Sequence, residues 1–302
     1  MKRLIALLLT LVLALSLCAC GGPAAAGDVP VEPVVTDGAV MGEGASSFTL
    51  KSTDLGETEI GGYLYEHFTA QMTREVAAAC EGAISQGYED ILVKDAHDSG
   101  RNIDPSKLPE QARIFRAWSR HPYSMMFGLD DSFDGVVFTG YHNAAGTNSN
   151  PLSHTMNRQN NFVKINGVIA SELMINSLTA AYIGVPVYCV CGDKGLCEWI
   201  QSVNPNIEVV AVNEGTGNGS MSIHPDVAVR RIRETVAKAV QKDGKDCMFP
   251  LPEHFHVEIN FREHYRAYDG GFYPGATQVD EKTVAYDSDD WMDCLKFFHW
   301  VL

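Results

Sequence analysis

Apolar and polar positions along this chain follow two periods, which predict helices and strands in turn. Residues 71–86 place Val76, Cys80 and Ala83 on one helical face, and Ile84 continues that face. A short apolar run at 91–93 then predicts a buried strand. The same patterns predict strands at 135–140, 185–191, 207–212, 255–261 and 283–286, and helices at 171–183, 225–240 and from about 289.

This alternation of strands and helices predicts an α/β fold, a layered domain whose mostly parallel central sheet is flanked by helices. Residues 255–261 read FHVEINF and alternate apolar with polar side chains. Such alternation is typical of a half-exposed antiparallel strand. We therefore also expect a smaller C-terminal α+β subdomain.

The first 20 residues have the composition of an export signal. Lys2 and Arg3 precede an apolar run at 4–17, which is too short to span a bilayer comfortably. The run ends in Leu-Cys-Ala-Cys, which resembles a bacterial lipobox with lipidation at Cys20. We expect residues 1–20 to be a lipoprotein signal peptide, and the protein to be exported and lipid-anchored on the outer face of the bacterial cytoplasmic membrane. An ordinary secretory signal cut near Ala19 is the alternative.

Residues 21–47 are rich in glycine, alanine and proline, which predicts a flexible tether before a folded domain at 48–302. The 302 residues carry 23 Lys and Arg against 38 Asp and Glu, a net charge of −15. Because nucleic-acid binders usually present a basic face, we expect no nucleic-acid partner. Removal of the signal leaves 21 basic residues against 38 acidic ones, so the mature charge is near −17. We expect attachment to the membrane through lipid and not through basic side chains.

Six cysteines lie beyond the export signal, and two of them, Cys189 and Cys191, stand in an apolar strand-like run. The surrounding string CVCGDKGLC lacks the paired CxxC spacing of a zinc site, so we interpret these residues as buried thiols. A disulfide outside the cytoplasm is the alternative, although no pairing can be deduced from the sequence.

Side chains suited to catalysis follow several predicted strands. His97 follows the strand at 91–93, and His142 follows the strand at 135–140. In open α/β sheets these carboxyl ends gather where ligands bind. Imidazole and carboxylate are the usual ligands of catalytic zinc, so both histidines could converge on one ion with Glu172 at a helix start. Asp95 and Asp193, also at strand ends, are interpreted as groups that orient a loop or a ligand, and Asp193 alternatively as a helix cap.

A series of short strings occurs in a fixed order between residues 71 and 290. They include KDAH, GLDDSFDGVVFTGYH, LSHTMN, INGVIASE, VPVYCVCGDK and VVAVNEGTGNGSMSIHP, followed by YPGA. In this order and spacing they resemble the D-aminopeptidases of the DppA type, a family of binuclear zinc metallopeptidases. The resemblance implies the family's fold and places its functional residues on this chain.

The family's site residues carry over position by position. The histidine of the family's D-[SA]-H string falls on His97, and the histidine of its G-Y-H string falls on His142, both as metal ligands. The glutamate of the N-G-x₄-E string falls on Glu172, a third ligand. The histidine of the S-H-[ST]-M string, which the family uses in catalysis, falls on His154.

The family's first metal motif, a strand ending in D-x-E-G, has no intact match in this chain. We favour Asp54, which follows a strand-like run in FTLKSTDLGE, with Glu57 as its partner, although the order of Gly and Glu is inverted. The alternative is Glu43 in VMGEG, which places Met41 where a bridging carboxylate belongs. The resemblance implies two zinc ions. If neither segment supplies ligands, the domain would hold one metal or none.

The resemblance implies an aminopeptidase that releases N-terminal D-amino acids from short peptides such as D-Ala-D-Ala. An exported lipoprotein would meet cell-wall peptides with D-residues, so the expected location agrees with this substrate class. The family's tendency to form rings implies a homo-oligomer. A non-catalytic exported binding lipoprotein with a degenerate metal site is the alternative function, and an assembly scaffold is a third.

Overall fold

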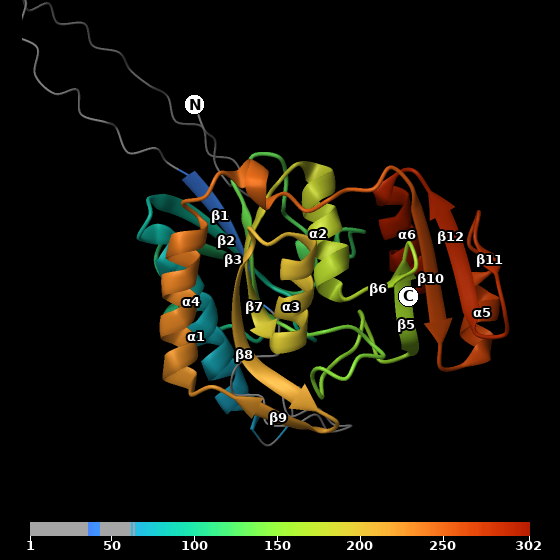
Figure 1. The fold of residues 1–302 in the computed structure, drawn as a ribbon, viewed down its shortest axis with the longest axis horizontal. Coiled ribbons are helices and arrows are strands. Elements are labelled where there is room, and N and C mark those ends of the chain that lie inside the picture. Colours follow the sequence, from blue (N-terminus) through green and yellow to red (C-terminus); the bar gives the residue numbers. More distant parts are fainter. Residues whose placement is uncertain (1–35, 43–61, 63) are drawn as a thin grey trace, which may run out of the picture.

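The computed structural model describes residues 36–42, 62 and 64–302 of the chain. Its centre is a seven-stranded sheet with the strand order β3-β2-β1-β4-β7-β8-β9 (Figure 1). Neighbouring strands are parallel except β9, which forms an antiparallel hairpin with β8. The prediction of a mostly parallel central sheet is confirmed. Its strands are β1 (Thr36–Gly42), β2 (Tyr88–Asp95), β3 (Ala112–Phe115), β4 (Val136–Tyr141), β7 (Val187–Asp193), β8 (Glu208–Thr216) and β9 (Gly219–Ser222).

Helices cover both faces of this sheet. On one face lie α1 (Tyr65–Ile84) and α4 (Pro225–Ala239), and on the other lie α2 (Glu172–Ile183) and α3 (Lys194–Val203) (Figure 1). The apolar face predicted for the first helix packs in one cluster with Ile232 and Val236 of α4. Gly82 allows this close approach, because a Cβ there would lie 2.6 Å from the carbonyl oxygen of Arg233. None of the described helices is both long and apolar enough to cross a bilayer.

A second sheet of five strands has the order β11-β12-β10-β5-β6 (Figure 1). Strand β10 pairs antiparallel with β12 and β5, and its side chains alternate between buried and half-buried positions. The antiparallel strand predicted at 255–261 is confirmed, but its sheet also recruits two strands from the middle of the chain. The elements are β5 (Asn160–Ile165), β6 (Val168–Ile169), β10 (Phe255–Phe261), β11 (Thr277–Gln278) and β12 (Thr283–Ser288), with α5 (His264–Gly270) and α6 (Trp291–Val301).

The direction of the chain through the large sheet reverses between β1 and β4. Strands β1, β2 and β3 follow one another to one edge, whereas β4, β7 and β8 run toward the other. In open α/β sheets ligands bind outside the carboxyl ends of the strands at such a point. Gly42, the last residue of β1, pairs with Thr139 near the end of β4. His142, the first residue after β4, therefore lies at the position where this fold class binds its ligands.

Strand β1 differs from the sequence-based expectation. Its residues, 36–42, fall within the range expected to be tether, so one strand of the central sheet lies upstream of residue 48. The segment TDGAVMG shows no strong strand pattern, but β2 and β4 pair with it on both sides. Such pairing with neighbouring strands decides strand formation more than intrinsic preference does. The expected signal peptide, the rest of the expected tether and the strand-like run before Asp54 lie outside the described residues.

The six cysteines beyond the export signal are buried free thiols. Cys189 and Cys191 both lie in β7, with their Sγ atoms 3.9 Å apart, so the prediction of buried thiols is confirmed. Burial raises the pKa of the Cys80 thiol to about 12. Because the thiolate is the reactive form, such a thiol is inert at neutral pH.

Candidate active site

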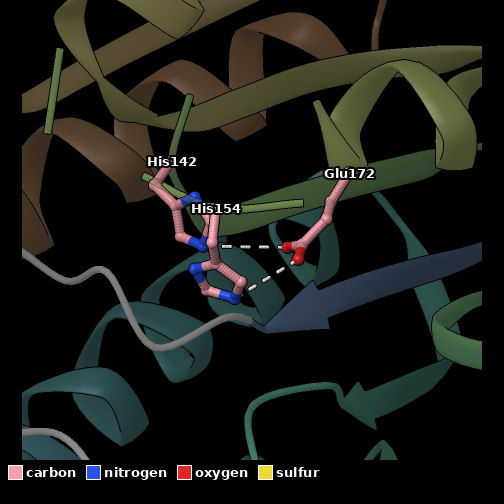
Figure 2. A group of neighbouring side chains, drawn as sticks. All are labelled: His142, His154 and Glu172. Carbon is pink, nitrogen blue, oxygen red and sulfur yellow. Dashed lines mark ion pairs between the residues drawn. The ribbon is translucent and has the colours of Figure 1, made fainter. Parts of the chain in front are cut away.

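Three of the side chains selected from the sequence meet in space: His142, His154 and Glu172 (Figure 2). Each offers a ligand atom within 4.8 Å of the other two. Nε2 of His142 lies 3.7 Å from Oε2 of Glu172, and Nε2 of His154 lies 3.5 Å from Oε1. The centroids of the two imidazole rings are 4.3 Å apart. The site therefore combines three separate stretches of chain: the end of β4, the loop before β5 and the start of α2.

The start of α2 fixes the position of Glu172. Ser171 caps this helix and accepts a hydrogen bond from the backbone nitrogen of Met174 at 3.2 Å, so Glu172 lies in the first turn. The helix dipole favours a carboxylate there. Oε1 of Glu172 also accepts from the backbone nitrogen of Met156 at 2.7 Å. This bond ties the loop that carries His154 to the helix that carries the carboxylate.

Asp193, at the end of β7, holds the loop between the two histidines. Its buried carboxylate accepts hydrogen bonds from the backbone nitrogen of Asn143 at 2.5 Å and from Oγ of Ser149 at 2.6 Å. It also accepts from the backbone nitrogen of Leu196 at 2.8 Å and thereby caps α3. Asp193 thus performs both roles considered for it, as a loop anchor and as a helix cap.

The hairpin of β8 and β9 also contacts the loop between His142 and His154. The backbone nitrogen of Gly215 donates to the carbonyl oxygen of Ser149 at 2.8 Å. A Cβ at Gly215 would lie 2.5 Å from that oxygen, so the contact requires glycine. Gly215 therefore lets the backbone of β8 lie directly against the backbone of this loop.

Backbone carbonyl groups determine which nitrogen of each imidazole carries the proton. Nδ1 of His142 lies 2.9 Å from the carbonyl oxygen of Asn143, and Nδ1 of His154 lies 2.6 Å from that of Leu152. Since a carbonyl oxygen only accepts, both Nδ1 atoms carry hydrogen. In the neutral rings each Nε2 is then an acceptor, and both acceptors face the carboxylate of Glu172.

This arrangement fits a bound metal cation. Acceptors that face one another repel, and Nε2 of His142 is buried without a hydrogen-bond partner among the described residues. A cation between them removes the repulsion, and neutral imidazole and carboxylate are zinc ligands. Tetrahedral zinc places its nitrogen and oxygen ligands about 3.4 Å apart, close to the observed separations. Hydrogen bonds from Nδ1 to backbone carbonyls are also the usual second interaction of zinc-binding histidines.

Exposure separates the two histidines. The side chains of His142 and Glu172 are 2% and 1% exposed, whereas that of His154 is 24% exposed. His154 also lines a cavity of about 680 Å³, a size typical of small-ligand sites. A ligand in this cavity can therefore reach His154 directly, whereas the buried side chains of His142 and Glu172 do not line the cavity.

His97 lies at the same edge of the sheet but outside this group. It follows β2, and β1 separates β2 from β4. Among the described residues, the cluster of possible metal ligands contains His142, His154 and Glu172 without it.

Asp95 orients the loop that carries His97, as expected. It accepts from the backbone nitrogens of Asn102 at 2.5 Å and Ile103 at 2.8 Å, and Nδ2 of Asn102 donates to the carbonyl oxygen of His97 at 2.6 Å.

The residues considered for the first metal motif lie outside the described part of the chain. This holds for Asp54 and Glu57 and for the alternative, Glu43. In the sequence, Glu43 directly follows the last residue of β1.

Several groups that align the site were not identified from the sequence. The carbonyls of Asn143 and Leu152 and the backbone nitrogen of Met156 act through the main chain, so residue type carries no signal for them. Ser149 acts through its hydroxyl but stands in a polar loop where serine is common. Asp193 was found because its place after an apolar strand is itself a signal.

Comparisons with known proteins find relatives over most of the chain. The family model described as D-aminopeptidase, peptidase family M55, matches residues 49–300. A D-aminopeptidase of Bacillus subtilis (strain 168) is 30% identical over 233 residues, which cover 76% of this chain and 84% of the relative. A solved structure, the Zn-dependent D-aminopeptidase DppA from Bacillus subtilis, described as a self-compartmentalizing protease, superimposes with a TM-score of 0.79 at 27% identity. That match covers 87% of this chain and 95% of the solved one.

Proposed function

The chain belongs to the D-aminopeptidase family and is a metallopeptidase, and from that premise we propose that it releases N-terminal D-amino acids from short peptides. Zinc is the metal indicated by the donor set and by the Zn-dependent solved relative. The observation that carries the proposal is the buried cluster of His142, His154 and Glu172 beside a cavity that only His154 of the three lines.

His142 and Glu172 would hold zinc, because both are buried and both direct acceptor atoms into one space. Zinc supplies Lewis acidity there, which polarises a peptide carbonyl and lowers the pKa of water. His154 would transfer the proton. Its Nδ1 donates to the carbonyl oxygen of Leu152, so in the neutral ring Nε2 carries no hydrogen. Nε2 can therefore accept a proton from the attacking group and return it to the leaving amine.

A second zinc ion would need ligands from the segment before α1, together with His97. Asp54 with Glu57, and alternatively Glu43, are the candidates. The position of β1 supports Glu43, since this residue follows directly after the strand that ends at the switch point of the sheet. Zinc analysis of Glu43→Gln and Asp54→Asn distinguishes them: the variant that loses one of two ions identifies the ligand, and full zinc in both would contradict both assignments.

The non-catalytic binding lipoprotein is not favoured, because all three clustered side chains retain metal-binding and proton-transfer chemistry. Hydrolysis of D-Ala-D-Ala by the zinc-loaded protein, with L-Ala-L-Ala as the stereochemical control, tests the function. We expect D-alanine release, and its absence with every short D-peptide would contradict the proposal.

The division of roles is tested with His154→Gln, matched to His264→Gln at an exposed histidine of α5. His154→Gln should reduce turnover by at least about a hundredfold, as expected for loss of general acid–base catalysis, with zinc content near that of the parent protein. His264→Gln should change neither. If His154→Gln loses zinc as completely as His142→Ala, His154 is a ligand and not the proton-transfer group.

Location and assembly are part of the same proposal. The sequence at 1–20 supports lipid attachment at Cys20, and Cys20→Ala should move the protein from the membrane to the soluble fraction. The self-compartmentalizing description of the solved relative supports a homo-oligomer, which sedimentation velocity measures. A Cys20→Ala variant that stays in the membrane fraction would contradict the lipid anchor. A monomer at micromolar concentration would contradict the homo-oligomer.

A further inference from the structure

The cavity beside His154 has a cationic lining on an acidic protein. Arg158 and Arg262 both line it, and no aspartate or glutamate does so among the described residues. The chain as a whole carries a net charge of −15. We call this cavity of about 680 Å³ the arginine pocket. Its local charge opposes that of the whole chain, so a general property of the surface does not explain it.

The pairing of β5 with β10 brings the backbone segments that carry the two arginines side by side. Asn160 and Phe261 are partners in the ladder, and the backbone nitrogen of Arg262 donates to the carbonyl oxygen of Gln159 at 2.9 Å. Arg158 lies two residues before β5, and Arg262 is the first residue after β10, so both arginines lie at the same end of this strand pair. Arg262 is exposed and makes no ion pair within the described part of the chain. Two guanidinium groups at one site repel each other and favour an anion that contacts both.

A buried polar atom provides a second, independent indication of a ligand. Asn160 lines the pocket, is 2% exposed, and has an Oδ1 atom with no hydrogen-bond partner among the described residues. Its Nδ2 is already used, since it donates to the carbonyl oxygen of Thr155 at 2.8 Å. A buried acceptor without a donor is costly unless a ligand supplies one. A peptide N–H is such a donor.

We propose that the arginine pocket binds the C-terminal carboxylate of a short peptide, while the Oδ1 atom of Asn160 accepts a hydrogen bond from a backbone N–H of that peptide. His154 lines the same pocket, so the carboxylate lies within reach of the bond that is cleaved. One extended residue spans about 3.5 Å, and this distance limits the substrate to a few residues. The inference rests on the proposed function and sharpens it: the substrates are di- and tripeptides with a free C-terminus.

Blocking the carboxylate tests the inference. Calorimetric titration of the zinc-loaded His154→Gln protein, whose turnover is expected to be at least about a hundredfold slower, compares D-Ala-D-Ala with D-Ala-D-Ala amide, in which a neutral carboxamide replaces the carboxylate. We expect the free acid to bind at least about tenfold more tightly, since charge-assisted hydrogen bonds to arginine are strong. Arg262→Gln in this background should remove most of the difference, and Arg262→Lys should retain part of it. Arg230→Gln, at an exposed position of α4, is the matched control and should leave the difference intact.

Kinetics of the otherwise unaltered enzyme provide a second measurement. Arg262→Gln and Arg158→Gln should each raise KM for D-Ala-D-Ala by about tenfold with little change in kcat, and should leave KM for the amide unchanged. Equal affinity for acid and amide, or an acid preference that survives in both arginine variants, would overturn the inference while D-alanine release could continue. Absence of D-alanine release would instead refute the proposed function, and the calorimetric comparison would still decide the role of the pocket.

Discussion

Asp193→Ala tests the conclusion that the site depends on one buried carboxylate behind it. The substitution removes the acceptor of three hydrogen bonds, from the backbone nitrogens of Asn143 and Leu196 and from Oγ of Ser149. Loss of the cap on α3 costs about 1 kcal/mol. Each of the other two donors, if left buried without a partner, costs about 1–3 kcal/mol. The total of about 3–7 kcal/mol is a large part of the stability of a typical domain, about 5–15 kcal/mol.

Urea unfolding, followed by circular dichroism, measures this loss, and Asp290→Ala is the matched control. Asp290 also caps a helix, α6, through one hydrogen bond from the backbone nitrogen of Met292 at 2.9 Å, but it is exposed. We expect the control to lose about 1 kcal/mol and to keep its zinc affinity. Asp193→Ala should also bind zinc about 10- to 100-fold more weakly, because the loop between His142 and His154 loses its anchor. Equal losses of stability in the two variants, with equal zinc affinity, would refute the reasoning.

Two further predictions concern zinc and pH. Zinc at about a hundred times its dissociation constant should stabilise the protein by about 2.7 kcal/mol, and Glu172→Ala should abolish this increase in thermal unfolding experiments. Asp289 and Asp287 raise the pKa of His254 above its usual 6.5, so its ion pairs stabilise the fold fully below pH 6.5 and are lost as pH rises through the raised pKa. The melting temperature of His254→Gln should therefore fall below that of the parent near pH 6 and match it in alkaline solution; a difference that persists there would contradict the assignment.

The elements with a clear period were the ones that the sequence could predict. The strand at 255–261 and the helix predicted at 225–240 match the structure because buried side chains recur along each at the period that the sequence shows, while the side chains between them are half-buried or exposed. β1 could not be predicted in this way. It lies between β2 and β4 in the centre of the sheet, and its formation depends on partners that are distant in sequence.

The candidate site shows the same division. Residue type and the resemblance selected His142, His154 and Glu172, and the structure brings these three together. Their alignment depends on main-chain groups and on Asp193, and only Asp193 has a side chain that sequence position could single out. The arginine pocket was not predicted at all, because it arises from the pairing of Asn160 with Phe261 across about a hundred residues of chain.

The charge distribution gives the arginine pocket a role that overall charge could not perform. A zwitterionic peptide that approaches a chain of net charge −15 has its carboxylate repelled and its ammonium group attracted. Salt screens this effect beyond about 8 Å at physiological ionic strength, so it orients the peptide only near the surface. Direct contact with Arg158 and Arg262 acts at hydrogen-bond distance, well inside this screening length. The arginines would thus position the end of the peptide that the rest of the protein repels, and the amino end would face the cluster formed by His142, His154 and Glu172.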